Sequence, residues 1–76
     1  MGYMVEYSKN GEAYAYDTYK PGTLISAIVD ELNYEMNRYG VDYDEITIFE
    51  SDDEESATIY YKVVNIHGNY KLVEIA

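Results

Sequence analysis

The sequence predicts a two-layer α+β domain, with about five antiparallel strands and one amphipathic helix in the order ββαβββ. Five short runs alternate apolar and polar residues or are rich in β-branched and aromatic residues, as strands are. One longer run repeats apolar residues every three or four positions, as a helix does when it packs on one face of a sheet. No repeat or linker interrupts residues 1–76, so we expect a single domain.

The first two runs, residues 3–8 and 12–19, are predicted to form a hairpin. Asn10-Gly11 lies between them and favours the two-residue type I′ turn that joins antiparallel strands. Tyr3 and Tyr7 alternate with residues of the other sheet face, and we expect both to pack in the core.

The helix is predicted over residues 23–39. Pro21-Gly22 ends the preceding strand, and Thr23 is placed to cap the helix by accepting a hydrogen bond from a backbone N–H. Gly40 is typical of the residue that follows a helix. The apolar face comprises Ile25, Ile28, Val29, Leu32, Met36 and Tyr39.

Three further strands are predicted after the helix, with short turns between them: residues 45–50, a turn at 51–56, residues 57–66, a turn at 67–69, and residues 70–75. Tyr60 and Tyr61 are adjacent in the longest of these strands, so their side chains must point to opposite faces. We expect Tyr61 to pack in the core and Tyr60 to be accessible to a partner.

The charge of the chain indicates a basic partner. Fifteen acidic residues against five basic ones give a formal net charge of −10, which repels nucleic acid and anionic membranes and attracts basic surfaces. A hydrophobic content of 47%, with eleven tyrosines, argues against disorder. Because the chain lacks cysteine, a secretory signal and an apolar run of membrane-spanning length, we expect a soluble, cytoplasmic protein.

Neither catalysis nor a cofactor is predicted. The only histidine lies in a turn, and no motif supplies a nucleophile beside a base. Asp42, Asp44 and Asp53 have the spacing of the first, third and twelfth ligands of a calcium loop. Ile46 and Thr47, however, occupy positions where that loop needs a ligand and a glycine, so no specific metal site is predicted.

The predicted partner-binding residues are carboxylates with interleaved tyrosines. They form three groups: Asp42, Tyr43, Asp44 and Glu45 before the third strand; Glu50, Asp52, Asp53, Glu54 and Glu55 after it; and Asp30, Glu31, Tyr34 and Glu35 on the helix. Like charges four apart on a helix cost a few tenths of a kcal/mol, so the sequence gives up stability to retain negative charge. Strand residues two apart are separated by about 6.8 Å, close to two base-pair rises of DNA. Alternate carboxylates can therefore imitate a row of phosphates, and tyrosine rings can stack on arginine.

Small, cysteine-free, acidic and tyrosine-rich, with carboxylate clusters on a compact scaffold, the chain resembles the DNA-mimic inhibitors that bacteriophages make. These include anti-CRISPR proteins, anti-restriction proteins and uracil-DNA glycosylase inhibitors. The resemblance implies a non-enzymatic inhibitor that occupies the basic nucleic-acid groove of a host defence protein. A CRISPR effector is the favoured target, because its guide and target strands run in positively charged channels.

Two other interpretations remain open at this point. The chain can be an acidic interaction module, such as an antitoxin, an adaptor or a small regulatory subunit, that binds a basic protein without imitating DNA. Alternatively, its charge serves solubility alone.

Overall fold

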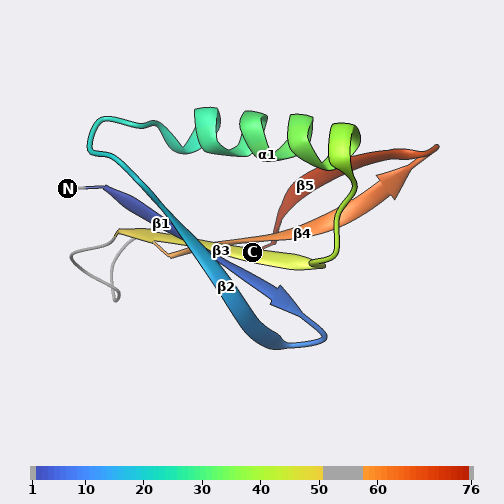
Figure 1. The fold of residues 1–76 in the computed structure, drawn as a ribbon, viewed down its shortest axis with the longest axis horizontal. Coiled ribbons are helices and arrows are strands. Elements are labelled where there is room, and N and C mark those ends of the chain that lie inside the picture. Colours follow the sequence, from blue (N-terminus) through green and yellow to red (C-terminus); the bar gives the residue numbers. More distant parts are fainter. Residues whose placement is uncertain (1, 51–57, 76) are drawn as a thin grey trace.

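The computed structural model describes residues 2–50 and 58–75, and it confirms the α+β class and the predicted element order. The elements are β1 (Tyr3–Lys9), β2 (Glu12–Tyr19), α1 (Ile25–Tyr39), β3 (Glu45–Glu50), β4 (Ile59–Ile66) and β5 (Asn69–Ile75). The strands form one antiparallel sheet in the order β2-β1-β3-β4-β5 (Figure 1). β2 and β3 thus lie parallel to each other on either side of β1, and α1 connects them.

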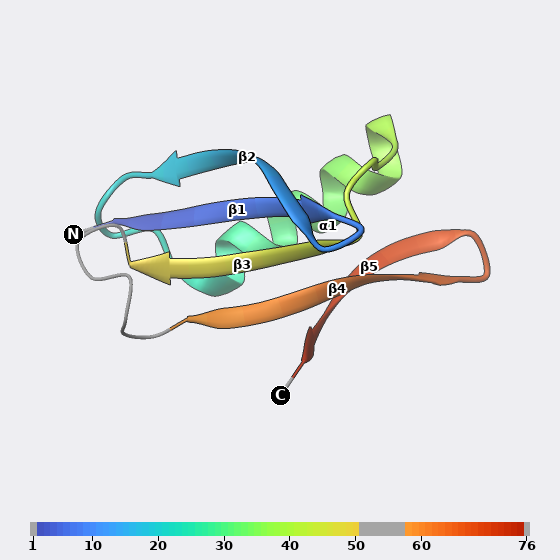
Figure 2. The same cartoon turned by 90° about the horizontal axis from the view of Figure 1, so that it is seen from below.

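α1 covers one face of the sheet, and the view from below shows the strands in front of the helix (Figure 2). The core lies between these two layers. It consists of Ile28, Leu32 and Met36 from the helix and Val5, Tyr7, Ile46, Ile48, Tyr61 and Leu72 from the strands. Tyr7 and Tyr61 are therefore core residues, as expected, and Tyr3 packs against the same cluster. Tyr60 lies on the opposite face and is 54% exposed, which confirms the predicted division between Tyr60 and Tyr61.

The first hairpin has the predicted turn and one unpredicted irregularity. Asn10 and Gly11 both have positive φ, at 52° and 83°, as a type I′ turn requires. The pairing starts at Lys9↔Glu12 and then shifts between Tyr7 and Ser8, so that Tyr14 has no partner in β1. This β-bulge adds one residue to β2 and reverses which of its side chains face the helix.

The start of α1 differs from the prediction. Thr23 does not cap the helix: its N–H donates to the carbonyl of Lys20 at 3.3 Å, which closes a turn over Pro21-Gly22. Leu24 is the N-cap residue, in extended conformation and without a side-chain cap, so α1 begins at Ile25. The predicted end is confirmed, because Gly40 has a φ of 91° and its N–H donates to Met36. Tyr39, predicted on the apolar face, is 77% exposed instead, since this last helical residue extends beyond the core.

Helix α1 also covers the edge strand β5. Asn37 accepts a hydrogen bond from the Tyr70 N–H and donates one to the Tyr70 carbonyl, both at 2.8 Å. Asn33 accepts one from the Leu72 N–H at 2.9 Å. These backbone groups would otherwise lie unpaired at the edge of the sheet. The two asparagines therefore pair the helix with one edge of the sheet.

Candidate functional site

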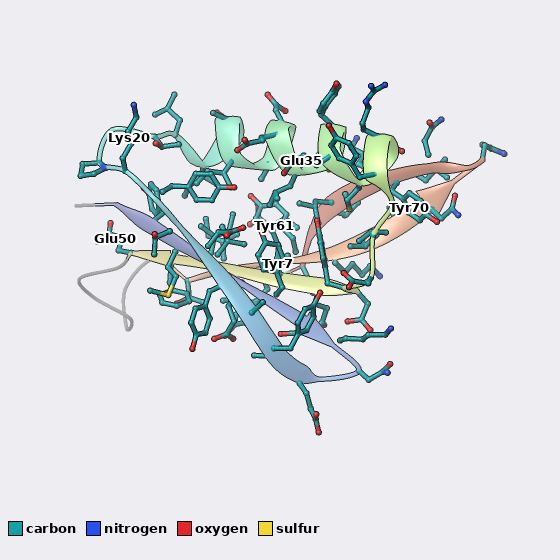
Figure 3. The ribbon with its side chains drawn as sticks, viewed as in Figure 1. Tyr7, Lys20, Glu35, Glu50, Tyr61 and Tyr70 are labelled. Atoms are coloured by element: carbon teal, nitrogen blue, oxygen red, sulfur yellow. The ribbon has the colours of Figure 1, made fainter. Side chains whose placement is uncertain are left out.

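An open pocket of about 220 Å³ lies where the other flank of α1 meets the β1–β2 hairpin and the loop before β3. We call it the tyrosine pocket. It is lined by Tyr7, Tyr14, Ala15, Leu32, Glu35, Asp42 and Tyr43. In Figure 3, Glu35 projects from the helix and Tyr7 lies below it in the sheet layer. The pocket thus combines residues from β1, β2, α1 and a loop.

Tyr7 and Tyr43 form the aromatic base of the pocket. Their ring centroids are 4.9 Å apart, within the range of interacting aromatic pairs, and the rings are tilted by 52°. The Tyr7 hydroxyl donates to Asp17 Oδ2 at 2.7 Å. Burial, followed by this hydrogen bond, raises the pKa of the Tyr7 hydroxyl far above its usual value. Burial, followed by the charge of Glu35, raises the pKa of Tyr43 to about 12.

Tyr14 reaches the pocket because of the β-bulge in β2. As the residue that the pairing omits, it lines the pocket beside its neighbour Ala15. Its hydroxyl donates to Asp42 Oδ1 at 2.9 Å, while the residue as a whole is 52% exposed. Partial burial and the hydrogen bond to Asp42 raise the pKa of Tyr14. Tyr14 therefore presents an accessible ring whose position is fixed by a carboxylate.

Asp44 fixes the loop before β3 to the β1–β2 hairpin on one side and to β4 on the other. Asp44 Oδ2 accepts from the Asn10 N–H at 3.0 Å, and the Asp44 N–H donates to the Ser8 carbonyl at the same distance. Its carbonyl accepts from the Val63 N–H at 2.9 Å. These bonds hold Asp42 and Tyr43 against the hairpin. Asp44 thus positions the residues that line the pocket.

A further tyrosine–carboxylate pair lies on the same flank of the helix. Tyr19 lies near Glu31, and burial together with the charges of Glu31 and Asp17 raises the pKa of Tyr19 to about 12. The carboxylates of Asp17, Asp42 and Asp44 accept from donors that carry no positive charge. A neutral donor fixes the orientation of a carboxylate and leaves its negative charge in place. The resulting surface is anionic and ordered.

Part of the predicted site comes together on this surface. Glu31, Glu35, Asp42, Tyr43 and Asp44 lie at the tyrosine pocket or directly beside it. The sequence interpretation missed the roles of Asp17, Tyr14 and Tyr19, and it treated Tyr7 as a core residue only. Strand alternation alone does not reveal them, because the bulge decides which β2 side chains face the helix.

The other predicted residues lie elsewhere. Tyr34 is 63% exposed and borders Asn33 and Asn37 on the β5 side of the helix, and Asp30 is exposed. Glu45 lies opposite Lys62 in the register of β3 and β4. Glu50 lines a recess with the segment that leads into α1, well away from Glu35 (Figure 3). The remaining four residues, Asp52, Asp53, Glu54 and Glu55, lie outside the described part of the chain.

In residues 2–50 and 58–75, no group of three histidine or acidic side chains is arranged to hold a metal ion. Within the same ranges, no helix has the length and apolar character needed to cross a membrane.

Comparisons with protein-family models, with curated proteins and with solved structures find no match to this chain.

Proposed function

We propose that this protein is a non-enzymatic inhibitor that acts in the cytoplasm by occupying a basic, nucleic-acid-binding surface of another protein. It contacts this partner through the tyrosine pocket and the carboxylates around it, and it uses neither a cofactor nor a metal. It binds no nucleic acid itself, because its net charge of −10 repels phosphates.

The observation that supports the proposal most directly is that neutral donors hold the carboxylates on this surface. Asp17 and Asp42 accept from tyrosine hydroxyls, and Asp44 accepts from a backbone N–H. An acidic surface that served only solubility would need no such fixed geometry. Fixed, uncompensated charges lower the ordering cost of binding a cationic partner.

Nucleic-acid-binding grooves are the class of basic surface that this arrangement fits best. Such grooves contact phosphates through arginine and lysine and often stack bases on aromatic or arginine side chains. Carboxylates can take the place of the phosphates, and tyrosine rings the place of the bases. CRISPR effectors are the first class of target to test, because they hold guide and target strands in positively charged channels. In this role the chain would be a phage anti-CRISPR protein.

The test is competition on a purified CRISPR effector and on a purified restriction nuclease. The protein should bind at least one of them, and that target's guide RNA or DNA should displace it. Binding should weaken steeply with added salt, since charge pairs on exposed surfaces are screened. Simultaneous binding of the protein and the nucleic acid, each with unchanged affinity, would contradict mimicry. It would favour an interaction module that recognises a basic protein elsewhere.

Two triple variants with the same net charge separate the shape of the surface from overall charge. Glu31→Gln, Glu35→Gln and Asp42→Asn neutralise the proposed surface, and they should abolish displacement of the nucleic acid. Glu6→Gln, Glu45→Gln and Glu74→Gln remove three charges outside it and should retain most of the activity. If both variants lost the ability to displace the nucleic acid equally, binding would depend on net charge alone. Replacing Asp52, Asp53, Glu54 and Glu55 with amides tests the acidic run separately.

A further inference from the structure

The composition of the tyrosine pocket indicates a more specific ligand than a generally basic surface. Three of its lining residues are tyrosines, two are carboxylates, and none is basic. The rings of Tyr7 and Tyr43 meet at 52°, so they form a corner instead of a flat stack. The faces of aromatic rings attract cations, and aromatic corners with nearby acids are typical of sites for organic cations.

The two carboxylates lie on different elements of the pocket wall. Glu35 projects from α1, whereas Asp42 lies in the loop before β3. Asp42 uses Oδ1 to hold the Tyr14 hydroxyl, so the ring and the carboxylate support each other's position. The charge of Glu35 also acts on Tyr43 at the base of the pocket. A cation inside the pocket would therefore contact aromatic faces and carboxylates simultaneously.

The size of the pocket limits what it can hold. Its volume of about 220 Å³ is below the roughly 300–1,000 Å³ of sites for drug-sized ligands. It is thus suited to one side chain of a protein partner. Leu32 and Ala15 add apolar surface that an aliphatic stem can contact.

We propose that the tyrosine pocket accepts the side chain of one arginine from the partner. A guanidinium group is planar, so it can stack on a tyrosine ring while its N–H donors form hydrogen bonds with Glu35 and Asp42. A lysine ammonium is a compact, strongly hydrated charge without a planar fork, so it stacks on a ring less well and forms no bidentate contact with a carboxylate. The arginine proposal deepens the proposed function, on which it rests for the identity of the partner, but the pocket itself can be tested without that partner.

The experiment is an NMR titration of the isotopically labelled protein with two end-blocked tripeptides, Gly-Arg-Gly and Gly-Lys-Gly, at constant ionic strength. Both peptides carry one positive charge, so they differ only in the cationic group. The arginine peptide should shift the amide signals of Tyr14, Leu32 and Tyr43 in a saturable way. It should bind about five-fold or more tightly than the lysine peptide. Equal affinities, or shifts spread over all acidic regions, would overturn the proposal.

Two single variants with the same charge change provide the matched control. Glu35→Gln removes a carboxylate from the pocket wall, whereas Asp30→Asn removes one from an exposed position of the same helix, outside the pocket. Glu35→Gln should weaken binding of the arginine peptide about five-fold or more, and Asp30→Asn by less than about two-fold. Tyr14→Leu, which keeps apolar bulk but removes an aromatic face, should also reduce the preference for arginine over lysine. Equal effects of Glu35→Gln and Asp30→Asn would show general charge attraction and no arginine site.

The outcomes distinguish this proposal from the one on which it rests. If the arginine peptide binds the pocket but nucleic acid never competes with the protein for a target, the inhibitor proposal fails and the pocket stands. If competition is observed but the arginine peptide produces no saturable shift in the pocket, the inhibitor proposal stands and the pocket proposal fails.

Discussion

The two flanks of helix α1 use polar side chains of similar size for opposite purposes. On the flank facing β5, Asn33 and Asn37 form hydrogen bonds with backbone groups of the edge strand. On the flank facing β2, Glu35 lines the tyrosine pocket, and Glu31 lies near Tyr19 one turn earlier. Each pair is spaced by four residues, so the same helical geometry produces two parallel polar rows.

This difference indicates which flank stabilises the fold and which flank retains negative charge. Neutral amides both donate and accept, so they can satisfy the N–H and C=O groups of an edge strand. Carboxylates only accept, and a like-charged pair on one helix is mildly destabilising. The asparagine flank is therefore structural, whereas the glutamate flank has a cost that folding alone does not explain. Four changes, in order of decreasing effect on stability, test this division.

The largest effect should come from the apolar ridge between the two flanks of α1, which is formed by Ile28, Leu32 and Met36. Ile28 is fully buried, so Ile28→Ala removes buried methylene and methyl groups and leaves a cavity. We expect a loss of about 2–5 kcal/mol in the free energy of unfolding, measured by urea denaturation. Leu24→Ala is the control, since Leu24 is 67% exposed and should change the stability little. An unchanged midpoint for Ile28→Ala would mean that the ridge is not the core.

The asparagine flank should be sensitive to the loss of a donor. Asn37 donates to the carbonyls of Asn33 and Tyr70, whereas Asn33 uses its side-chain oxygen to accept from Leu72. Asn37→Asp therefore loses two donors and places a carboxylate beside two carbonyls, and it should cost about 1–2 kcal/mol. Asn33→Asp adds the same charge but keeps its acceptor, so it should cost less. Equal costs in denaturation experiments would show that charge, and not the hydrogen bonds, is responsible.

Stability should depend on alkaline pH through the tyrosines of the glutamate flank. The pKa values of Tyr19 and Tyr43 are raised from 10 to about 12 in the folded protein. Above pH 10 the unfolded chain releases these protons while the folded protein keeps them, so the unfolded state binds fewer protons and stability falls as pH rises. The contribution is fully present below pH 10 and is lost by about pH 12.

The measurement is the free energy of unfolding as a function of pH in the wild type and in Tyr19→Phe/Tyr43→Phe. Subtracting the two curves removes the titration of all other groups. The wild type should lose more stability than the variant between pH 10 and 12. Parallel curves over that range would indicate that these hydroxyls ionise as freely in the folded protein as in the unfolded chain.

The smallest effect should come from neutralising the glutamate flank. In Glu31→Gln/Glu35→Gln the amide oxygens can still accept hydrogen bonds, while the repulsion between the two charges disappears. We expect the free energy of unfolding to stay within about 0.5 kcal/mol of the wild type, or to rise slightly. A loss of more than about 1 kcal/mol would assign these carboxylates a structural role and remove the contrast between the flanks.

Local sequence patterns were sufficient to predict the fold class, the element order and most of the core. Alternation and three-to-four spacing report directly on burial, which is why Ile28, Leu32 and Met36 were identifiable on the helix. Asn10-Gly11 fixed the first turn, since few other residues adopt positive φ at low cost. The start of the helix was predicted two residues early, because the Thr23 backbone closes a turn with Lys20 instead.

The side chains that share the candidate site could be identified only from the folded chain. If the pairing that begins at Lys9↔Glu12 continued without a bulge, Val5 would oppose Tyr16; with the bulge, it opposes Asp17. One extra residue thus turns Asp17 and Tyr19 toward the helix, because side chains alternate between faces at every position of a strand. The same bulge places Tyr14 where its hydroxyl can donate to Asp42, which lies 28 residues later in the sequence. Local patterns describe which residues are polar or apolar, but the register between strands determines which of them meet.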